Sequence, residues 1–302
     1  MVDQDSDVRE TIPEDAVIVG IDGSERDATC VAWGAGAATR ARKPLHLLHA
    51  HDLAAEMAAT DPVAARGMAA VADLEDDTIL PRAIEAARAK WPDLSITGSD
   101  PWTSPERALV EASEGAHLVV VGSKRVSGLE RLLLGRSALA VAMHAKCPVV
   151  LLPVGARTDA EGPVVVGVDG SEHSVAAADR AFWIAQIRRT SVRVVISWHL
   201  EVVDGMVVTT PDNPAWATVE AKYHGLAERT ISSIAARYPN VRSEIVVRRG
   251  TPAKVLTAES ADASLLVMGS RGRGGFRGML LGSVTHKVIE TATSPVMVIR
   301  HA

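Results

Sequence analysis

The chain repeats itself at a constant offset of 147 residues, and this repeat restricts its fold more than any other feature of the sequence. The segment VIVGIDGSE at 17–25 recurs as VVVGVDGSE at 164–172. At the same offset, CPVVLL near the end of the first copy corresponds to SPVMVI near the end of the chain. No gap is needed between these segments, which indicates two copies of one domain. We expect the first copy to span residues 1–156 and the second to span residues 157–302.

Within each copy, short valine-rich runs alternate with longer amphipathic stretches, which is the pattern of an α/β domain. In the second copy this pattern predicts strands at about 163–169, 192–198, 242–249, 264–270 and 295–300, and helices at about 173–189, 215–237, 252–261 and 283–292. Strands separated by helices imply a parallel sheet with helices on both faces. We therefore expect an α/β fold of two tandem doubly wound domains, each a five-stranded parallel sheet flanked by helices.

Composition and charge exclude several classes of partner. The 302 residues carry a formal net charge of −5, so the chain has no general attraction to nucleic acid. Its first ten residues lack the apolar core of a signal peptide, and no apolar run reaches the roughly 18 residues of a membrane span. We expect a cytoplasmic protein with neither a nucleic-acid nor a membrane partner. Cys30 and Cys147 do not correspond in the repeat, so we expect buried free thiols rather than a disulfide.

The strand order predicts where a ligand would bind. A doubly wound sheet binds ligands beyond the carboxyl ends of its strands, at the point where the strand order reverses. In the second copy, Asp169 ends the first predicted strand and Gly269 ends the fourth. These two residues flank that point if the first and fourth strands are neighbours in the sheet.

The stretch that begins at Gly269, GSRGRGGFRGMLLGSVT, is rich in glycine and arginine and has no carboxylate. Its later glycines, which allow backbone N–H groups to approach an anion closely, are Gly272, Gly274, Gly275 and Gly282. Ser283 is the predicted N-cap of a helix whose first N–H groups and positive dipole end face the loop. Positive charge comes from Arg271, Arg273 and Arg277, unless these side chains point into solvent. We interpret the stretch as a phosphate-binding loop; the alternative is a simple surface turn.

These features resemble the ATP-binding branch of the universal stress protein family in its tandem two-domain form. The resemblance covers nearly the whole chain and rests on VGVDGS, on RGTPAKVL and above all on the spacing Gly269-x2-Gly272-x9-Gly282-Ser283. It implies a Rossmann-like domain in each copy, ATP as the cofactor with or without Mg²⁺, and a regulatory role in stress survival. The residues it places beside the nucleoside are Gly167 and Asp169. Those it places around the phosphates are Gly269, Ser270, Arg271, Gly272, Arg273, Gly274, Gly275, Gly282, Ser283 and Val284.

The first copy departs from this pattern where phosphate would bind. Arg125 stands at the position of Gly272, Glu130 at that of Arg277 and Arg136 at that of Ser283. A carboxylate close to a triphosphate is unfavourable, and the loss of a charge-assisted hydrogen bond costs about 1.5–3 kcal/mol. We expect a nucleotide site in the second copy alone. The alternative is that Arg125 itself binds the phosphates, because guanidinium is a good phosphate partner.

Other candidate residues give weaker indications. On a strand only His49 and His51, of the three histidines in HLLHAH, share a face, and no spaced cysteine or carboxylate completes a metal site. Asp22 is expected to shape the Asp-Gly-Ser turn and cap the next helix. Neither copy has a nucleophile elbow or a zinc-protease motif, so we expect no catalytic residues and a protein that is not a dedicated enzyme. A slow ATPase and a nucleotide-independent interaction protein are the alternatives.

The last predicted strand of each copy is a continuous apolar run, CPVVLLPV in the first and SPVMVIR in the second. An exposed edge strand of this kind needs a partner or a cover. We expect the two strands to pair antiparallel, which makes one chain a pseudo-dimer of its two domains. Association of whole chains into a homodimer is left open by the sequence, as is the identity of any protein partner.

Overall fold

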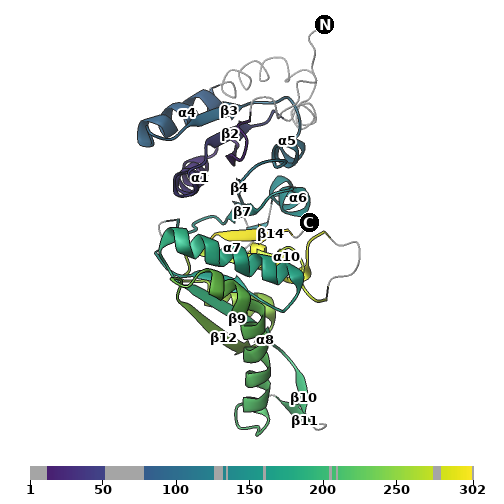
Figure 1. Ribbon diagram of the computed structural model, residues 1–302. Coiled ribbons are helices and arrows are strands. Elements are labelled where there is room, and N and C mark those ends of the chain that lie inside the picture. Colours follow the sequence, from purple (N-terminus) through teal and green to yellow (C-terminus); the bar gives the residue numbers. More distant parts are fainter. Residues whose placement is uncertain are drawn as a thin grey trace, which may run out of the picture. The chain divides into compact units, whose positions relative to one another are not determined.

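The computed structural model describes residues 12–51, 78–125, 132–133, 135–158, 161–203, 206–208, 210–274 and 280–300 (Figure 1). Two compact units are present. The described residues from 12 to 124 and from 135 to 152 belong to the first unit. Residues 125, 132 and 133 and those from 153 to 300 belong to the second. The predicted pairing of the two final strands concerns the placement of the units relative to one another and stays a prediction.

The second unit contains a five-stranded parallel sheet in the order β12–β9–β8–β13–β14. Its strands are β8 (Val164–Gly167), β9 (Val192–Trp198), β12 (Ser243–Arg249), β13 (Leu265–Gly269) and β14 (Val296–Ile299). The first and fourth predicted strands, β8 and β13, are neighbours, with Leu265 beside Val164. The α/β class and the doubly wound strand order are therefore confirmed. After β8 the chain adds β9 and β12 on one side of it, and then β13 and β14 on the other side, so the strand order reverses between β8 and β13.

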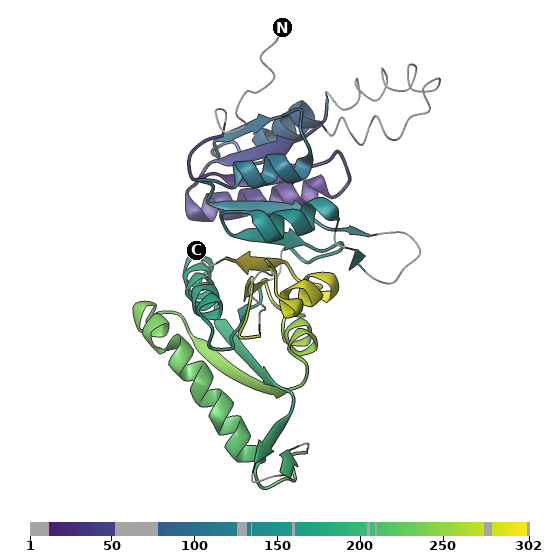
Figure 2. The ribbon, with the colours of Figure 1, turned by 90° about the vertical axis from the view of Figure 1, so that its right-hand side faces the viewer.

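Helices cover both faces of this sheet. They are α7 (Glu172–Arg188), α8 (Trp216–Arg237), α9 (Pro252–Glu259) and α10 (Ser283–Thr291). Helices α7 and α8 lie on one face, and α9 and α10 lie on the other (Figure 2). The central strand β13 is buried on both sides, which explains why its sequence LLVMG is apolar throughout instead of alternating.

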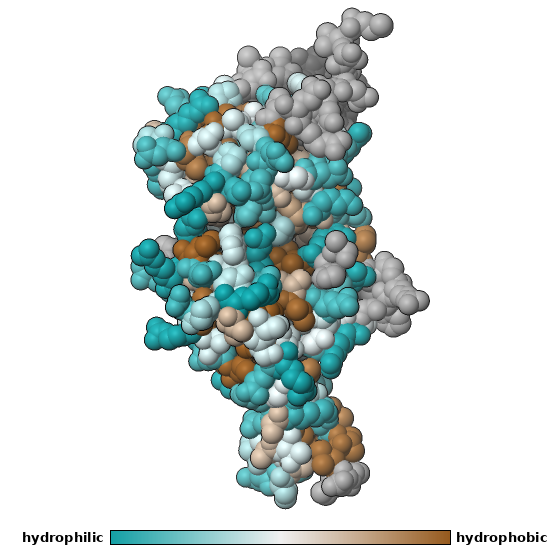
Figure 3. Space-filling model, viewed as in Figure 1, coloured by the Kyte–Doolittle hydropathy of each residue, from teal (hydrophilic) through white to brown (hydrophobic). Residues whose placement is uncertain are grey.

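A hairpin that the sequence did not predict follows β9. It pairs β10 (Glu201–Val203) with β11 (Met206–Val208) in an antiparallel ladder. Glu201 holds it to α8 by accepting hydrogen bonds from the Lys222 ammonium and the Tyr223 hydroxyl. Each strand is only three residues long, too short for a periodic pattern to be recognised. Its outer face exposes Leu200, Val202 and Val207, and Figure 3 shows hydrophobic side chains gathered there.

The first unit repeats this architecture in its sheet, with the order β3–β2–β1–β4–β7. Its strands are β1 (Val17–Ile21), β2 (Leu45–His49), β3 (Ile96–Ser99), β4 (Leu118–Gly122) and β7 (Val149–Leu152). Its described helices are α1 (Asp27–Ala41), α4 (Ile79–Lys90), α5 (Pro105–Ala112) and α6 (Arg136–His144). A separate short ladder pairs β5 (Lys124–Arg125) with β6 (Leu132–Leu133).

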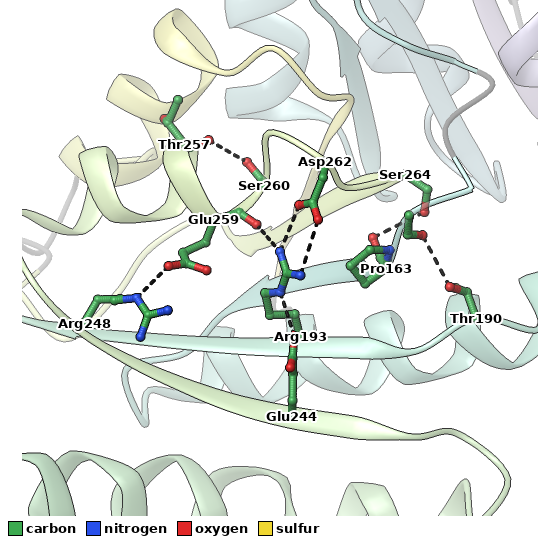
Figure 4. A network of polar contacts seen from close by, with 11 residues as sticks. Pro163, Thr190, Arg193, Glu244, Arg248, Thr257, Glu259, Ser260, Asp262 and Ser264 are labelled. Carbon is green, nitrogen blue, oxygen red and sulfur yellow. Dashed lines mark hydrogen bonds and ion pairs between the residues drawn. The ribbon is translucent and has the colours of Figure 1, made fainter.

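An arginine near the start of β9 joins three elements of the second unit (Figure 4). The Arg193 guanidinium donates to Glu244 on β12 at 2.7 Å and to both carboxylate oxygens of Asp262 at 2.9 and 3.4 Å. It also donates to the backbone carbonyl of Glu259, the last residue of α9, at 2.8 Å. The Arg193 side chain is only 20% exposed, but its partners Glu244 and Asp262 are 60% and 64% exposed, so water partly screens both ion pairs.

Both cysteines are buried free thiols, as expected. In the described ranges, no helix has both the length and the apolar composition that a membrane span needs.

We predict that Arg193→Met lowers the free energy of unfolding of the second unit by about 1 kcal/mol, because it leaves the half-buried Glu259 carbonyl and two carboxylates without their donor. The control is Arg248→Met, which removes one ion pair, that of a more exposed arginine with Glu259, and should cost about 0.5 kcal/mol or less. Denaturant unfolding of both variants checks this, and equal losses would contradict it.

The effect of Arg193→Met should also depend on pH. The hydrogen bond from Arg193 is the main cause that lowers the pKa of Asp262 in the folded protein. A carboxylate with a depressed folded pKa stabilises the fold above its unfolded pKa and loses this contribution as the pH falls. The difference between wild type and Arg193→Met should therefore shrink as the pH is lowered below about 4.

Candidate functional site

A cavity of about 450 Å³ lies at the carboxyl ends of β8 and β13 in the second unit. This is within the size range of small-molecule sites, roughly 300–1,000 Å³. One side is formed by the glycine-rich loop and the start of α10, and the other by apolar residues of the sheet and α9. Its lining includes the predicted residues Gly167, Asp169, Gly269, Arg271, Gly272, Arg273, Gly274, Gly282, Ser283 and Val284.

Of the predicted residues that the structure describes, Ser270 does not line the cavity. Ser270 is buried behind the loop, where its N–H donates to the carbonyl of Ile299 on β14 at 2.7 Å. Gly275 lies outside the described residues, as does Arg277.

The loop is held against the end of β8 by one carboxylate. Asp169 Oδ2 accepts the backbone N–H of Arg273 at 2.8 Å. Its Oδ1 accepts the N–H and the hydroxyl of Ser171 at 3.0 and 2.6 Å. The loop comes so close that a Cβ atom at Gly272 would collide with Asp169 Oδ2. Gly272 is therefore required by the approach of the loop backbone to Asp169, and not only by approach to a ligand.

The same contacts determine the charge of Asp169. Burial alone would raise its pKa, but the hydrogen bonds from Ser171 and from the Arg273 N–H outweigh burial and hold the pKa below its usual value. Asp169 is thus ionised at neutral pH, with its charge directed into the turn and the loop backbone.

The far end of the loop returns to its beginning. The N–H of Gly282 donates to the carbonyl of Ser270 at 2.7 Å, and the Thr285 hydroxyl donates to the carbonyl of Gly269 at 2.9 Å. These bonds place the first turn of α10 beside the cavity, where its unpaired N–H groups favour an anion.

The prediction that Ser283 caps α10 is wrong. The N-cap is Gly282, which has extended backbone angles and whose carbonyl accepts the N–H of His286 at 2.9 Å. The helix begins at Ser283, the first residue of its predicted range, and Ser283 makes no capping bond but lines the cavity. Gly135 is likewise the N-cap of α6, so Arg136 does not replace a capping side chain in the first copy.

Three arginines give this part of the second unit positive charge. Arg271 and Arg273 line the cavity. Arg300, which the sequence analysis missed, has a lowered pKa because it is buried and because the positive charge of Arg271 is nearby. Its Nη1 atom is buried without a hydrogen-bond partner among the described residues. Positive charges held close together, without carboxylate partners among the described residues, favour the binding of an anion.

The opposite side of the cavity is apolar and was not predicted residue by residue. It is formed by Val168, Val195, Pro252, Leu256 and Met268, with the hydroxyl-bearing residues Ser174 and Ser197 beside them. Leu256 packs close to the strand end, because a Cβ at Gly167 would lie 2.9 Å from its Cδ2. The repeat could have identified these residues, because each of their positions except that of Ser174 has an apolar or small residue in the first copy as well.

The first unit has a cavity of about 220 Å³ at the corresponding place. In this unit the Arg26 guanidinium joins the two strand ends, as the loop backbone does in the second unit. It donates to Asp22 Oδ2 at 3.3 Å and to the carbonyl of Ser123 at 3.2 Å. Asp22 shapes the turn as predicted, since its Oδ1 accepts the N–H of Ser24. It does not cap α1, whose N-cap is Arg26 without a side-chain bond.

The first unit also places a carboxylate where the second has a hydroxyl. Asp27, the counterpart of Ser174, accepts the backbone N–H of Gly23 at 2.8 Å and that of Asp22 at 3.2 Å. Burial is the main cause that raises the pKa of Asp27 to about 6, and the neighbouring Asp22 carboxylate acts in the same direction. In the second unit, the Ser174 hydroxyl donates to the carbonyl of Ser171 instead.

The histidines of the first unit have structural partners. His46 Nδ1 lies 2.8 Å from the Thr97 hydroxyl and Nε2 lies 2.9 Å from the Ser99 hydroxyl, and burial lowers its pKa to about 4. His49 and His51 meet edge to face at 5.0 Å. Among the described residues, no three histidine, cysteine or carboxylate side chains are grouped as metal ligands.

Comparison with known proteins gives consistent matches. The model of the universal stress protein family matches twice, at residues 15–153 and 162–300. A universal stress protein of Mycolicibacterium smegmatis is 34% identical over 296 residues, which cover 95% of this chain and 97% of that protein. A universal stress protein of Mycobacterium tuberculosis is 34% identical over 293 residues, which cover 95% of this chain and 97% of that one.

Solved structures share the fold. A universal stress protein from Archaeoglobus fulgidus aligns with a TM-score of 0.67 at 19% identity, covering 96% of this chain and 100% of that one. A Pseudomonas aeruginosa protein described as a putative universal stress protein aligns with a TM-score of 0.61 at 20% identity, covering 94% and 92%.

We predict that the two equivalent turns contain carboxylates with opposite shifts. Asp27 should titrate near pH 6 because it is buried, whereas Asp169 should titrate below the usual value of 3.8 because hydrogen bonds stabilise its charge. Carboxyl ¹³C chemical shifts measured against pH test this, with Asp27→Ser and Asp169→Asn to assign the signals. Titration of both groups in the ordinary range would contradict the geometry of the two turns.

Proposed function

Because the chain belongs to the universal stress protein family, we propose that it is an ATP-binding regulatory protein of the stress response, with the nucleotide held by the second unit. The first domain, residues 1–156, has the altered nucleotide loop, and the second, residues 157–302, has the intact one. The adenine lies in the apolar slot between Val195 and Leu256, and the phosphates lie on the loop and the start of α10.

The observation that carries the proposal is the division of the cavity into an apolar half and a cationic half. The cationic half presents backbone N–H groups, the start of α10 and two arginines, a combination suited to a phosphate chain. The apolar half is suited to a flat base. Asp169 does not oppose this, because both of its oxygens are directed to Ser171 and to the Arg273 N–H.

The proposal is for binding and not for rapid hydrolysis. Asp169 is the sole carboxylate among the residues that line the cavity, and it already accepts hydrogen bonds from the turn and the loop. Hydrolysis needs a group that positions or deprotonates the attacking water. Slow hydrolysis and nucleotide-independent interaction are the competing functions. We place the protein in the cytoplasm, where ATP is plentiful and where its unpaired cysteines fit a reducing compartment.

We predict close to one ATP bound per chain in a calorimetric titration. Gly272→Arg should weaken binding at least tenfold, about 1.4 kcal/mol, because the side chain cannot pass Asp169 and would push the loop away from the phosphates. Asp169→Ala should weaken binding because it releases the Arg273 N–H, whereas its matched control Asp22→Ala should not. Two equivalent sites, or full binding by Gly272→Arg, would contradict the proposal.

We predict that the first unit gains ATP binding only when its obstacles are removed together. The combination is Arg125→Gly, Glu130→Arg and Asp27→Ser, each giving the residue type found in the second copy. Arg136 needs no change as a cap, since Gly135 already caps α6. The control keeps Asp27 and changes only the other two residues; it should stay without measurable ATP binding at the first unit. A second ATP bound by the control would show that Asp27 is no obstacle.

A further inference from the structure

Two arginines of the second unit follow the carboxyl ends of the neighbouring strands β13 and β14. The N–H of Ser270 donates to the carbonyl of Ile299 at 2.7 Å, and the next residues along the two strands are Arg271 and Arg300. Because neighbouring strands lie about 4.8 Å apart, the backbone at the two arginines runs side by side. Both side chains are half-buried, and Arg271 lines the cavity.

This arginine pair has no anionic partner among the described residues. The Nη1 atom of Arg300 is buried without a hydrogen-bond partner. Burial, and after it the positive charge of Arg271, lower the pKa of Arg300. By contrast Arg193, at the amino end of the same sheet, binds two carboxylates and a carbonyl. A cation removed from water beside a like charge is costly unless an anion joins it, so the pair is incomplete without a ligand.

The pair lies on the side of the loop away from the apolar half of the cavity. That half extends to β9, which contributes Val195, whereas Arg300 follows β14. The order β9–β8–β13–β14 puts three strand spacings, about 14 Å, between β9 and β14. A nucleotide whose base lies in the apolar half can therefore reach the pair only with the end of its phosphate chain.

The first copy has only one of these two charges. At the repeat offset, Lys124 stands at the position of Arg271, and Pro153 stands at the position of Arg300. A cation after the fourth strand of the domain is thus common to both copies. The cation after the fifth strand exists in the second copy alone, which is the copy with the intact glycine loop.

We propose that Arg300, together with Arg271, binds the terminal phosphate of the nucleotide and makes the second unit selective for a triphosphate over a monophosphate. This rests on the proposed function, which puts the base in the apolar half of the cavity. Arg300 is then a specificity-determining residue: it supplies charge-assisted hydrogen bonds to a group that AMP lacks. The terminal phosphate in turn supplies the anion that the arginine pair does not find in the protein.

The first test compares the binding of ATP and AMP to the full chain by calorimetry. Arg300→Met should weaken ATP binding at least tenfold and leave AMP binding unchanged, whereas Arg300→Lys, which keeps the charge, should retain part of the preference for ATP. The control is Arg248→Met, which removes an arginine that pairs with Glu259 and should change neither affinity. An equal loss of ATP and AMP binding in Arg300→Met would show a structural role and overturn the assignment.

The second test uses thermal unfolding and the effect of inorganic triphosphate. Without ligand, Arg300→Met should unfold at a higher temperature than wild type, because it removes an uncompensated charge. Unfolding at a lower temperature would overturn the assignment, since Arg300 would then already have a partner in the protein alone. Inorganic triphosphate should raise the unfolding temperature of wild type more than that of Arg300→Met.

The two tests together separate this inference from the proposed ATP function. If neither ATP nor AMP binds but inorganic triphosphate stabilises wild type and not Arg300→Met, the ATP function fails and the arginine pair stands as a polyphosphate site. If ATP and AMP bind and Arg300→Met changes neither affinity, the ATP function stands and the role of Arg300 fails. If nucleotides and inorganic triphosphate all leave wild type unaffected, both fail.

Discussion

The contact between Asp169 and the backbone at Gly272 and Arg273 is the constraint on which the second unit's site depends. It joins the end of β8 to the loop after β13, and it leaves no room for a side chain at position 272. The Gly282 N–H then ties the far end of the loop to Ser270 and sets the start of α10 beside the cavity. A single carboxylate, held ionised by its donors, thereby fixes the loop that carries Arg271 and Arg273 beside the cavity.

In the first unit, side chains instead of loop backbone join the strand ends and accept the N–H groups of the turn. Its strand ends are joined by the Arg26 guanidinium, and its turn N–H groups are satisfied by Asp27. The difference extends to the opposite end of the sheet, where Arg193 of the second unit corresponds to His46 of the first. Arg193 binds two carboxylates and a carbonyl, whereas His46 bonds two hydroxyls. The two copies keep the same strand order, but at each end of the sheet their polar contacts are made by different groups.

Much of this could be predicted from sequence because it depends on periodic or spaced patterns. The strands of the second unit begin and end within two residues of their predicted bounds, and the glycine spacing placed the loop at the correct strand end. What failed depended on a single backbone angle or on one long-range contact. Ser283 looked like an N-cap, but Gly282 caps the helix with its backbone alone. The role of Arg26 depends on Ser123, 97 residues away, and no local pattern reports such a contact.

The Asp27 carboxylate has a consequence for how independently each half of the chain folds. In the first turn, the N–H groups of Asp22 and Gly23 donate to Asp27, so these donors are not available to an anion from solution. The second turn leaves a cationic surface open, and any anion that binds only the folded form adds to the stability of that half by mass action. Resistance to unfolding and proteolysis in the second half would then rise with the concentration of such an anion.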